Sequence, residues 1–570
     1  MRKSLLAVLA CVLAVATVSA SGPKIMNLSL TAPATTLNAH VTELSEIEII
    51  DYVQGCLYQW VPSADRKAHF LDAELAAGKP VAGADGTTWT IKIDPKAKWA
   101  NGEPITADSF MYSWKKALEP AMLNTPGGST VGKNYINIKN AFAYYTQAST
   151  GKAITWAEVG LKKVDDRTLS IVTDGRYTQQ EVMQHFAWRT TGPVYEKLYE
   201  AGMDASRRKT QYGTSLEKYM SSGPFMLKSW ASGSDMVLER NPNYLRSSII
   251  KLDGMRWRVV SDASARLQLF EKGELDYVPL STSTVSIYED DPRLVTYDTP
   301  NIRCIEINRT NPEKPILANK NFQKALYYAM DRQAMARLVY GIPAPLIVST
   351  RSIALDDGTK YRSMAIAKAN VPAGNGYDPK LAKQYFDKAM AEEKLTKLTL
   401  QLNYFEQIDA TKVMSEYLQK RLVQIFGADR FELKLQGSTK ALDIMKASIG
   451  KEPASYDLSW MGWSLTAESF SPAAKFQVYT SDSSRRVANY GNKELDALYA
   501  KAISDEIRGN KNEVAKLAAR MEKIFRDEVL SVPVIQVQFF VLISERIKTG
   551  CIDNQPGFAT WGWEFADIKK

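Results

Sequence analysis

Cysteine and histidine are scarce in this chain. Its 570 residues include 4 cysteines and 3 histidines, and no C-x-x-C or H-E-x-x-H pattern occurs. Zinc sites and disulfide scaffolds depend on such clustered side chains. We therefore expect no metal site, no cofactor and no cysteine framework. We interpret His40, His69 and His185 as ordinary surface or core residues.

Long apolar runs and blocks of like charge are also lacking beyond residue 20. No later segment approaches the roughly twenty apolar residues that cross a membrane. The 72 basic and 63 acidic residues are interspersed along the chain, without the basic stripe that nucleic-acid binding needs. Hydrophobic residues make up 45% and charged residues 24%, which is typical of globular proteins. The sequence therefore indicates a large protein of about three or four structural units that binds no nucleic acid.

The N-terminus has the composition of an export signal. Arg2 and Lys3 precede an apolar run that reaches Val18, and small residues stand at positions 18–20. We expect a signal peptide over residues 1–20, cleavage before Ser21, and a periplasmic or extracellular mature protein. A lipid anchor at Cys11, after Val-Leu-Ala, is the alternative, but the apolar run continues seven residues beyond it.

Cleavage before Ser21 removes two basic residues, so the formal net charge falls from +9 to +7. It leaves three cysteines, Cys56, Cys304 and Cys551. These three cysteines could form one disulfide, and the sequence alone cannot assign which two would pair.

Short strand patterns alternate with helical ones, which is typical of an α/β protein. Alternation predicts strands over 25–30 and 89–93, and apolar spacing predicts a helix over 46–60 and another after Thr106. Asp85-Gly86 and 99–102 are expected turns. Further helices are expected over 320–340, 379–392, 410–425 and 494–528, and the longest loops around 120–132 and 349–376.

Two patterns suggest enzyme chemistry without the context it needs. The segment 127–134 differs by one residue from a phosphate-binding loop, but Asn134 replaces the Ser or Thr that would hold magnesium, so we interpret it as a flexible loop.

The second pattern follows the order of motifs in an acyl-serine penicillin-recognising enzyme. It consists of Ser215-Leu-Glu-Lys218, Tyr490-Gly-Asn492 and Lys548-Thr-Gly550. Residues 221–224, Ser-Ser-Gly-Pro, interrupt the long helix that such a serine should open, and we expect no enzyme.

Trp460-Met-Gly462-Trp463 follows a strand-like segment and precedes a polar loop. Aromatic rings at a strand end, beside a glycine that allows close approach, are suited to lining a ligand cavity. Packing of the same rings in the core is the alternative interpretation.

Residues 89–114, from Trp89-Thr-Ile-Lys-Ile to Ser-Trp114, resemble the signature of the oligopeptide- and dipeptide-binding proteins of bacterial ABC importers. Further matching pieces follow in the same order along the mature chain: 222–225, Trp230, 238–244, 273–276, 324–326, 329–332, 377–379, 456–458, 462–463 and 532–534.

The resemblance implies a three-lobed periplasmic-binding-protein-like α/β fold with two hinge strands and the ligand buried between lobes. The implied parts are the signal peptide (1–20), lobe I in three segments (21–55, 181–300 and 536–570), the family-specific lobe II (56–180) and lobe III (301–535).

The resemblance also implies ligand-binding residues. In peptide binders of this family, a carboxylate shortly after Gly-Trp pairs with the ligand's ammonium group. Here Thr466 holds that position when counted from Gly462, and Glu468 when counted back from Pro472. Trp460 stands where an arginine is frequent and Ser464 where a cysteine occurs in some relatives. A second acid falls on Glu43, with Ser45 beside it. The expected ligand-binding residues are Glu43, Ser45, Trp460, Gly462, Trp463, Ser464, Thr466 and Glu468.

The implied function is capture of a peptide or peptide-like solute, by a monomer, for delivery to the membrane permease of an ABC importer. An oligosaccharide stacked on the tryptophans, or a metal chelate, is the alternative ligand on the same fold.

Overall fold

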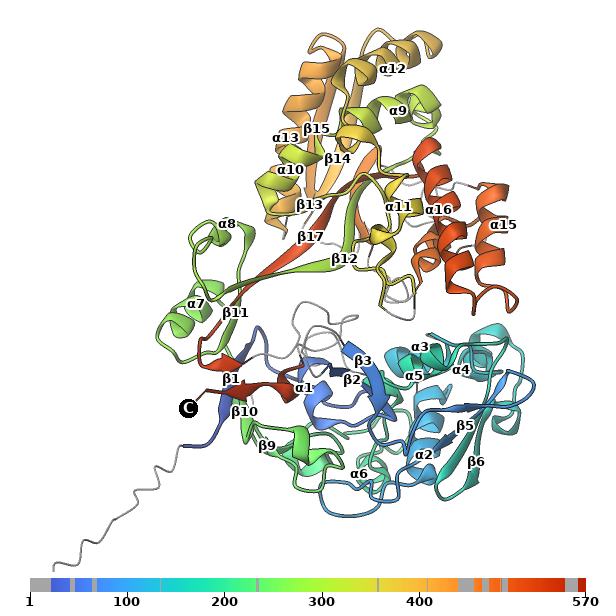
Figure 1. The fold of residues 1–570 in the computed structure, drawn as a ribbon, viewed down its shortest axis with the longest axis vertical. Helices are drawn as coiled ribbons and strands as arrows, with labels where there is room; N and C mark the ends of the chain where they lie inside the picture. The colour runs from blue at the N-terminus through green and yellow to red at the C-terminus, as the bar shows by residue number, and fades with distance from the viewer. Residues whose placement is uncertain are drawn as a thin grey trace, which may run out of the picture.

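The computed structural model describes residues 22–41, 47–63, 69–122, 124–133, 135–231, 235–355, 358–406, 408–438, 456–463, 471–481, 483, 491–548 and 562–569. These residues form a lower body and an upper body, and the two long strands β12 (Leu294–Ile307) and β17 (Val532–Ile543) run between them (Figure 1).

The lower body is built on two four-stranded sheets and a hairpin. The first sheet has the order β1 (Ile25–Leu30), β10 (Gly254–Val259), β9 (Asp235–Arg240), β8 (Phe225–Trp230). The second has the order β4 (Val81–Ala82), β5 (Thr88–Lys92), β7 (Thr168–Val172), β6 (Leu161–Asp165). The hairpin pairs β2 (Tyr58–Pro62) with β3 (His69–Ala73).

The helices of the lower body are α1 (Ile47–Val53), α2 (Ala107–Leu118), α3 (Thr125–Gly132), α4 (Ala141–Thr150), α5 (Gln179–His185) and α6 (Glu196–Ala201). Helix α2 begins after Thr106 as predicted, and its Phe110, Trp114 and Leu118 are buried on one face. One continuous core joins these helices to both sheets and to the C-terminal residues near Trp563.

Three distant stretches of the chain meet in the lower body. The Asp276 carboxylate accepts hydrogen bonds from the Asn27 backbone N–H at 2.7 Å and from Nε and Nη2 of Arg546 at 2.5 and 2.6 Å. Near the C-terminus, β18 (Ile547–Lys548) pairs with β19 (Asp567–Ile568). The start, the middle and the end of the described chain therefore form a single body.

The upper body contains a seven-stranded sheet covered on both faces. Its order is β11 (Tyr277–Pro279), β17, β12, β16 (Leu458–Trp463), β14 (Leu398–Phe405), β15 (Phe431–Ser438), with β13 (Ile342–Pro343) on β17. Ile305 and Trp460 belong to the core on one face, and Cys304 and Met461 to the core on the other. Short helices α7 (Ala263–Glu271) and α8 (Thr282–Val285) lie beside β11 (Figure 1).

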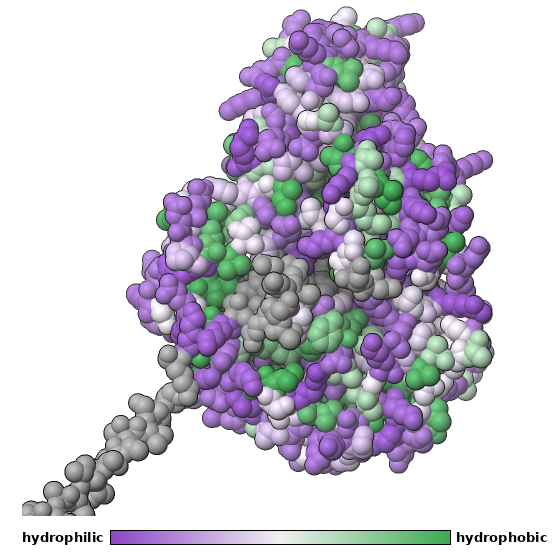
Figure 2. Space-filling view, in the orientation of Figure 1, coloured by the Kyte–Doolittle hydropathy of each residue, from purple (hydrophilic) through white to green (hydrophobic). Residues whose placement is uncertain are grey.

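The helices of the upper body are α9 (Lys320–Ala329), α10 (Arg332–Val339), α11 (Ala365–Lys368), α12 (Pro379–Glu392), α13 (Asp409–Phe426), α15 (Lys493–Ala502) and α16 (Lys511–Asp527). The helix predicted over 379–392 is confirmed, and α13 extends the one over 410–425 by one residue at each end. No helix in the described ranges is long and apolar enough to cross a membrane. The face of the molecule in Figure 2 is largely hydrophilic, with scattered hydrophobic areas.

Three predicted helices are wrong in extent because local hydrogen bonds interrupt them. The helix over 46–60 ends at Val53, and residues 58–62 pair with β3 instead. The helix over 320–340 breaks before Arg332, where the Asp331 carboxylate caps α10 by accepting from the Ala334 N–H. The helix over 494–528 breaks between α15 and α16, and Asn510 caps the second part.

The long loop predicted around 120–132 and the flexible loop predicted over 127–134 are also wrong for the residues that form α3, 125–132. Glycines make its close packing feasible: a Cβ on Gly127 would lie 3.1 Å from the His40 Cα, and one on Gly128 would lie 2.4 Å from the Tyr145 ring. The segment therefore packs between neighbouring elements, and it does not form a phosphate-binding loop.

Candidate functional site

Most of the predicted ligand-binding residues lie outside the described residues. Glu43 and Ser45 fall within 42–46, and Ser464, Thr466 and Glu468 within 464–470. Trp463 is the last residue of β16, and only its backbone is described. Their roles stay predictions.

The Trp460 side chain lies in the core of the upper body. This agrees with core packing, the alternative interpretation to lining a ligand cavity. It is 0% exposed, and its Nε1–H donates to the Ser415 Oγ on α13 at 2.8 Å. In this arrangement the ring packs α13 against the sheet. A role for Trp460 in ligand binding stays a prediction.

Gly462 lies opposite Arg303 of β12 in the antiparallel register. A Cβ at position 462 would stand 2.6 Å from Nη1 of Arg303 and 2.8 Å from Oδ1 of Asn301. The glycine therefore leaves space for two polar side chains at this end of the sheet. Sequence reasoning missed Arg303 and Asn301, since nothing in the local pattern marks them.

A polar network lies where β12 and β17 pass between the two bodies. The register of this pair shifts between Asp298 and Ile302, so ladder hydrogen bonds are interrupted there. Side chains replace them: Gln536 donates to the Thr299 carbonyl at 2.9 Å and to the Thr350 Oγ1 at 2.8 Å, and Thr350 donates to the Asp298 carboxylate at 2.9 Å. The connection between the bodies is thus a bulged strand pair held by side chains.

The two bodies also touch at a second place, which we call the rim contact: residues 175–181 of the lower body and 505–508 between α15 and α16. The Arg176 N–H donates to the Asp505 carboxylate at 2.8 Å, and Arg508 Nη1 donates to the Arg176 carbonyl at 2.8 Å. The Arg508 guanidinium also lies over the Tyr177 ring, 4.3 Å from its centroid. The bodies are therefore in contact both at the strand pair and at the rim.

The lower body encloses a charged cluster around Arg189. Its Nη1 lies 2.7 Å from Glu74 Oε2 and its Nε lies 3.3 Å from Asp51 Oδ1. Burial by itself lowers the pKa of Arg189, but the negative charges nearby, above all that of Glu74, outweigh it and hold the pKa above its ordinary value. Burial raises the pKa of the neighbouring Cys56 thiol to about 12. This cysteine is therefore a poor nucleophile.

Glu564 adds a third acid from the C-terminal segment. It is 4% exposed, and its Oε2 has no hydrogen-bond partner among the described residues. Burial raises the pKa of Glu564 to about 7, and the Arg189 charge opposes this shift. At neutral pH the carboxyl group is close to its titration midpoint.

The described parts of the enzyme-like patterns lack catalytic geometry. Ser215 precedes a single 3-10 turn, Leu216–Lys218, rather than a long helix. The Asn492 side chain caps α15, where its Oδ1 accepts hydrogen bonds from the Glu494 and Leu495 N–H groups.

Metal-ligating side chains do not gather within the described ranges, where no group of three His, Cys, Asp or Glu is arranged to hold an ion. Burial lowers the pKa of His40 and of His185 to about 3. Both are neutral core residues at physiological pH, as the sequence suggested. Cys56 and Cys304 are both buried and free, and Cys551 lies outside the described residues.

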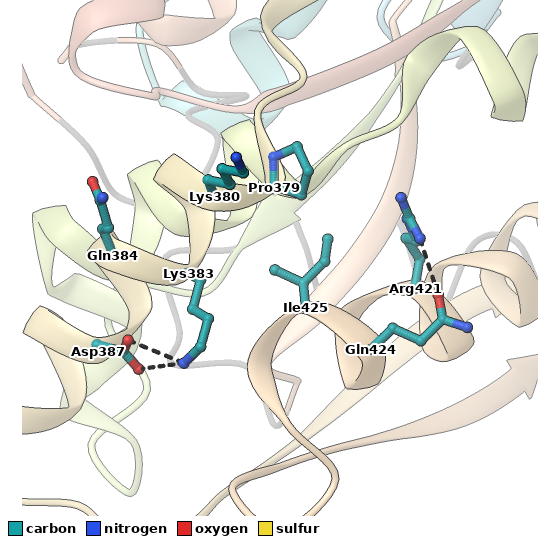
Figure 3. Close-up of a pocket in the computed structure, with 8 residues that line it drawn as sticks. All are labelled: Pro379, Lys380, Lys383, Gln384, Asp387, Arg421, Gln424 and Ile425. Carbon is teal, nitrogen blue, oxygen red and sulfur yellow. Dashed lines mark hydrogen bonds and ion pairs between the residues drawn. The ribbon is translucent and has the colours of Figure 1, made fainter.

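A surface groove lies between α12 and α13, at the end of the upper body away from the lower body (Figures 1 and 3). Lys383 pairs with Asp387 across one turn of α12, and Arg421 donates to the Gln424 side chain at 3.1 Å. The groove is lined by Pro379, Lys380, Lys383, Gln384, Asp387, Arg421, Gln424 and Ile425. None of these residues belongs to the site that the sequence predicts.

Comparison with known proteins gives a family match over most of the chain. The model for "Bacterial extracellular solute-binding proteins, family 5 Middle" matches residues 72–499. The dipeptide-binding protein of Lactococcus lactis is 25% identical over 496 residues, which cover 84% of this chain and 83% of that protein. The oligopeptide-binding protein OppA of Bacillus subtilis is 26% identical over 481 residues, covering 82% and 79%.

Solved structures agree with the arrangement described above. Listeria monocytogenes OppA bound to peptide superimposes with a TM-score of 0.68 at 22% identity, over 96% of this chain and all of that one. The ABC transporter substrate-binding protein CtaP of the same organism gives a TM-score of 0.72 at 17% identity, with the same coverage. These likenesses confirm the expected multi-lobed α/β fold.

Proposed function

Because the chain belongs to the bacterial extracellular solute-binding proteins of family 5, we propose that it captures a peptide outside the cytoplasm and delivers it to the permease of an ABC importer. The observation that carries the proposal is the family match over residues 72–499, together with relatives named as dipeptide- and oligopeptide-binding proteins. Two bodies joined by a strand pair suit a protein that closes around its ligand. Such closure needs no catalytic group, and we expect no hydrolysis of peptides or β-lactams.

The lobe boundaries belong to this proposal. The expected divisions at 300/301 and 535/536 place the hinge in β12 and β17. Two observations support them: the register shift between Asp298 and Ile302, and the Gln536 side chain that bonds across it. A bulged strand pair bends more readily than a regular ladder, because fewer backbone hydrogen bonds hold it.

The amino group of the peptide is bound by a carboxylate in this proposal, with Glu468 as the residue and Glu43 as a second acid from the other lobe. An ammonium group enclosed between lobes requires a negative partner, since an unpaired buried charge costs several kcal/mol. Ser45, Trp463, Ser464 and Thr466 are the remaining proposed contacts. Gly462 contributes space rather than a polar group.

Calorimetry with tetra-alanine and its N-acetylated form tests the capture of peptides. Glu468→Gln should weaken binding of the free-amine peptide by roughly 2–5 kcal/mol, the scale of losing one partner of a buried charge pair, and barely affect the acetylated form. Glu416→Gln, on the exposed side of α13, is the matched control. Mass spectrometry of the solute that co-purifies with the native protein decides between a peptide and an oligosaccharide or chelate. A sugar or a chelate in that spectrum would refute the peptide ligand.

Export and assembly complete the proposal. We expect a mature N-terminus at Ser21, a monomer in solution, and a contact with the permease in the membrane. Intact mass of the exported protein checks the first of these. A lipid-modified species that starts at Cys11 would contradict cleavage before Ser21.

A further inference from the structure

Arg303 is set apart from the other enclosed arginines by its surroundings. Arg189 is neutralised by Glu74 and Asp51. Arg332, at 0% exposed, donates to the carbonyl groups of Tyr327, Met330, Asn375 and Pro533. The guanidinium group of Arg303 has neither kind of partner among the residues that the structure describes. Loss of water around it lowers its pKa, whereas nearby acids raise the pKa of Arg189.

The Arg303 guanidinium lies over Gly462, next to the Asn301 side chain. Arg303 is partly buried, and it shares the space above Gly462 with Asn301. Any side chain at position 462 would force the guanidinium group to move, because a Cβ would stand 2.6 Å from Nη1. Glycine at this position therefore keeps open the space that the guanidinium occupies.

The place of Arg303 in the sheet is the usual one for a ligand. Strands β14, β15 and β16 run parallel and end at Phe405, Ser438 and Trp463. In open α/β sheets, ligands bind outside the carboxyl ends of such strands. Arg303 pairs with Gly462 at this edge, where β12 enters the upper body from the lower one (Figure 1).

We propose that Arg303 binds a carboxylate of the captured solute, so that a negatively charged group on the peptide determines specificity. The proposal rests on the proposed function and names the chemistry that it selects. A guanidinium group presents a planar fork of donors that matches a carboxylate with two parallel hydrogen bonds. The partly buried position lets the solute reach this fork while it excludes much of the competing water.

A single negative charge fits better than a phosphate. A phosphate with nearly two charges would remain under-neutralised by one arginine, whereas a carboxylate balances it. The carboxylate can come from the C-terminus of a peptide or from an acidic side chain.

Calorimetry with matched alanine peptides tests the assignment and separates the two sources. The probes are tetra-alanine, tetra-alanine amide, and the amide of Ala-Ala-Ala-Asp. If the C-terminus is the partner, the wild type should bind the free acid at least about 30-fold more tightly than the amide. If a side chain is the partner, the aspartate-containing amide should gain instead.

Variants then assign the preference to this residue. Arg303→Gln should reduce the affinity for the carboxylate-bearing peptide to that of tetra-alanine amide, and leave the latter affinity unchanged. Gly462→Ala should cause the same loss by displacing the guanidinium, and it provides a second test if Arg303→Gln does not fold. Arg520→Gln is the control, since this arginine of α16 is exposed and pairs with Glu494.

The outcomes are distinct. A carboxylate preference that Arg303→Gln abolishes supports the inference. Equal affinities of the wild type for all three peptides, or a preference that survives in both variants, overturns the inference and leaves the proposed function standing. Failure of the wild type to bind any of these peptides, or any peptide that co-purifies with it, contradicts the proposed function and this inference together.

Discussion

Glu564 makes the stability of the lower body depend on pH in a predictable direction. Its carboxyl group is buried beside Arg189, Asp51 and Glu74, and burial raises its pKa from 4.5 to about 7. In the unfolded chain the group ionises near 4.5. The folded protein therefore holds one more proton than the unfolded chain between these two values.

The sign follows from this difference in bound protons. Because the folded-state pKa is raised, the contribution of Glu564 to stability is fully present below pH 4.5 and is lost as pH rises through about 7. The loss amounts to about 3 kcal/mol, since one pKa unit corresponds to about 1.4 kcal/mol. Glu564→Gln removes the titration. We expect the variant to match the wild type near pH 4.5 and to exceed its stability by about 3 kcal/mol above pH 7.

Urea unfolding across this pH range measures the difference, with Glu416→Gln as an exposed control. The two curves for Glu564→Gln and the wild type should separate progressively between pH 4.5 and 7. A constant difference at all pH values, or a variant that becomes relatively less stable as pH rises, would refute the reasoning. The first result would mean that folding leaves the pKa of Glu564 unshifted, and the second that the Glu564 carboxylate is stabilised in the folded state, for example by Arg189.

Two further predictions follow from contacts in and between the bodies. Arg508→Ala removes the donor that binds the Arg176 carbonyl at the rim contact. We expect this contact also to join the two bodies around bound peptide, so release of the peptide should become about 5-fold faster, corresponding to about 1 kcal/mol for a partly exposed contact. Stopped-flow fluorescence measures the release rate, and an unchanged rate would mean that the rim contact does not join the bodies around the peptide. Trp460→Ala should destabilise the upper body by about 3–5 kcal/mol, because it leaves a cavity and removes the hydrogen bond that the Ser415 Oγ accepts from the ring; a melting temperature equal to that of the wild type would show that the ring is not part of the core.

The family, the alternation of strands and helices, and several elements were accessible from the sequence alone. The strand at 25–30 and the helix at 379–392 match their predicted bounds, because alternation and a proline after an Asp cap are local signals. The expected export came from the composition of the N-terminus, and the expected function came from short ordered motifs. Neither needs knowledge of contacts.

Only the tertiary structure decided where helices break and which charges meet. The helix breaks before Arg332 because Asp331 caps α10. The Arg332 side chain also donates hydrogen bonds to the carbonyl groups of Asn375 and Pro533, which belong to other segments of the chain. Arg303 becomes a proposed site residue only because β12 lies beside β16, which places its guanidinium above Gly462. The pKa of Glu564 likewise depends on burial against Arg189, 375 positions away in the chain. The sequence gives the chemistry of each side chain. The position of Arg303 and the pKa of Glu564 depend on the neighbours that folding brings together and on the water that folding removes.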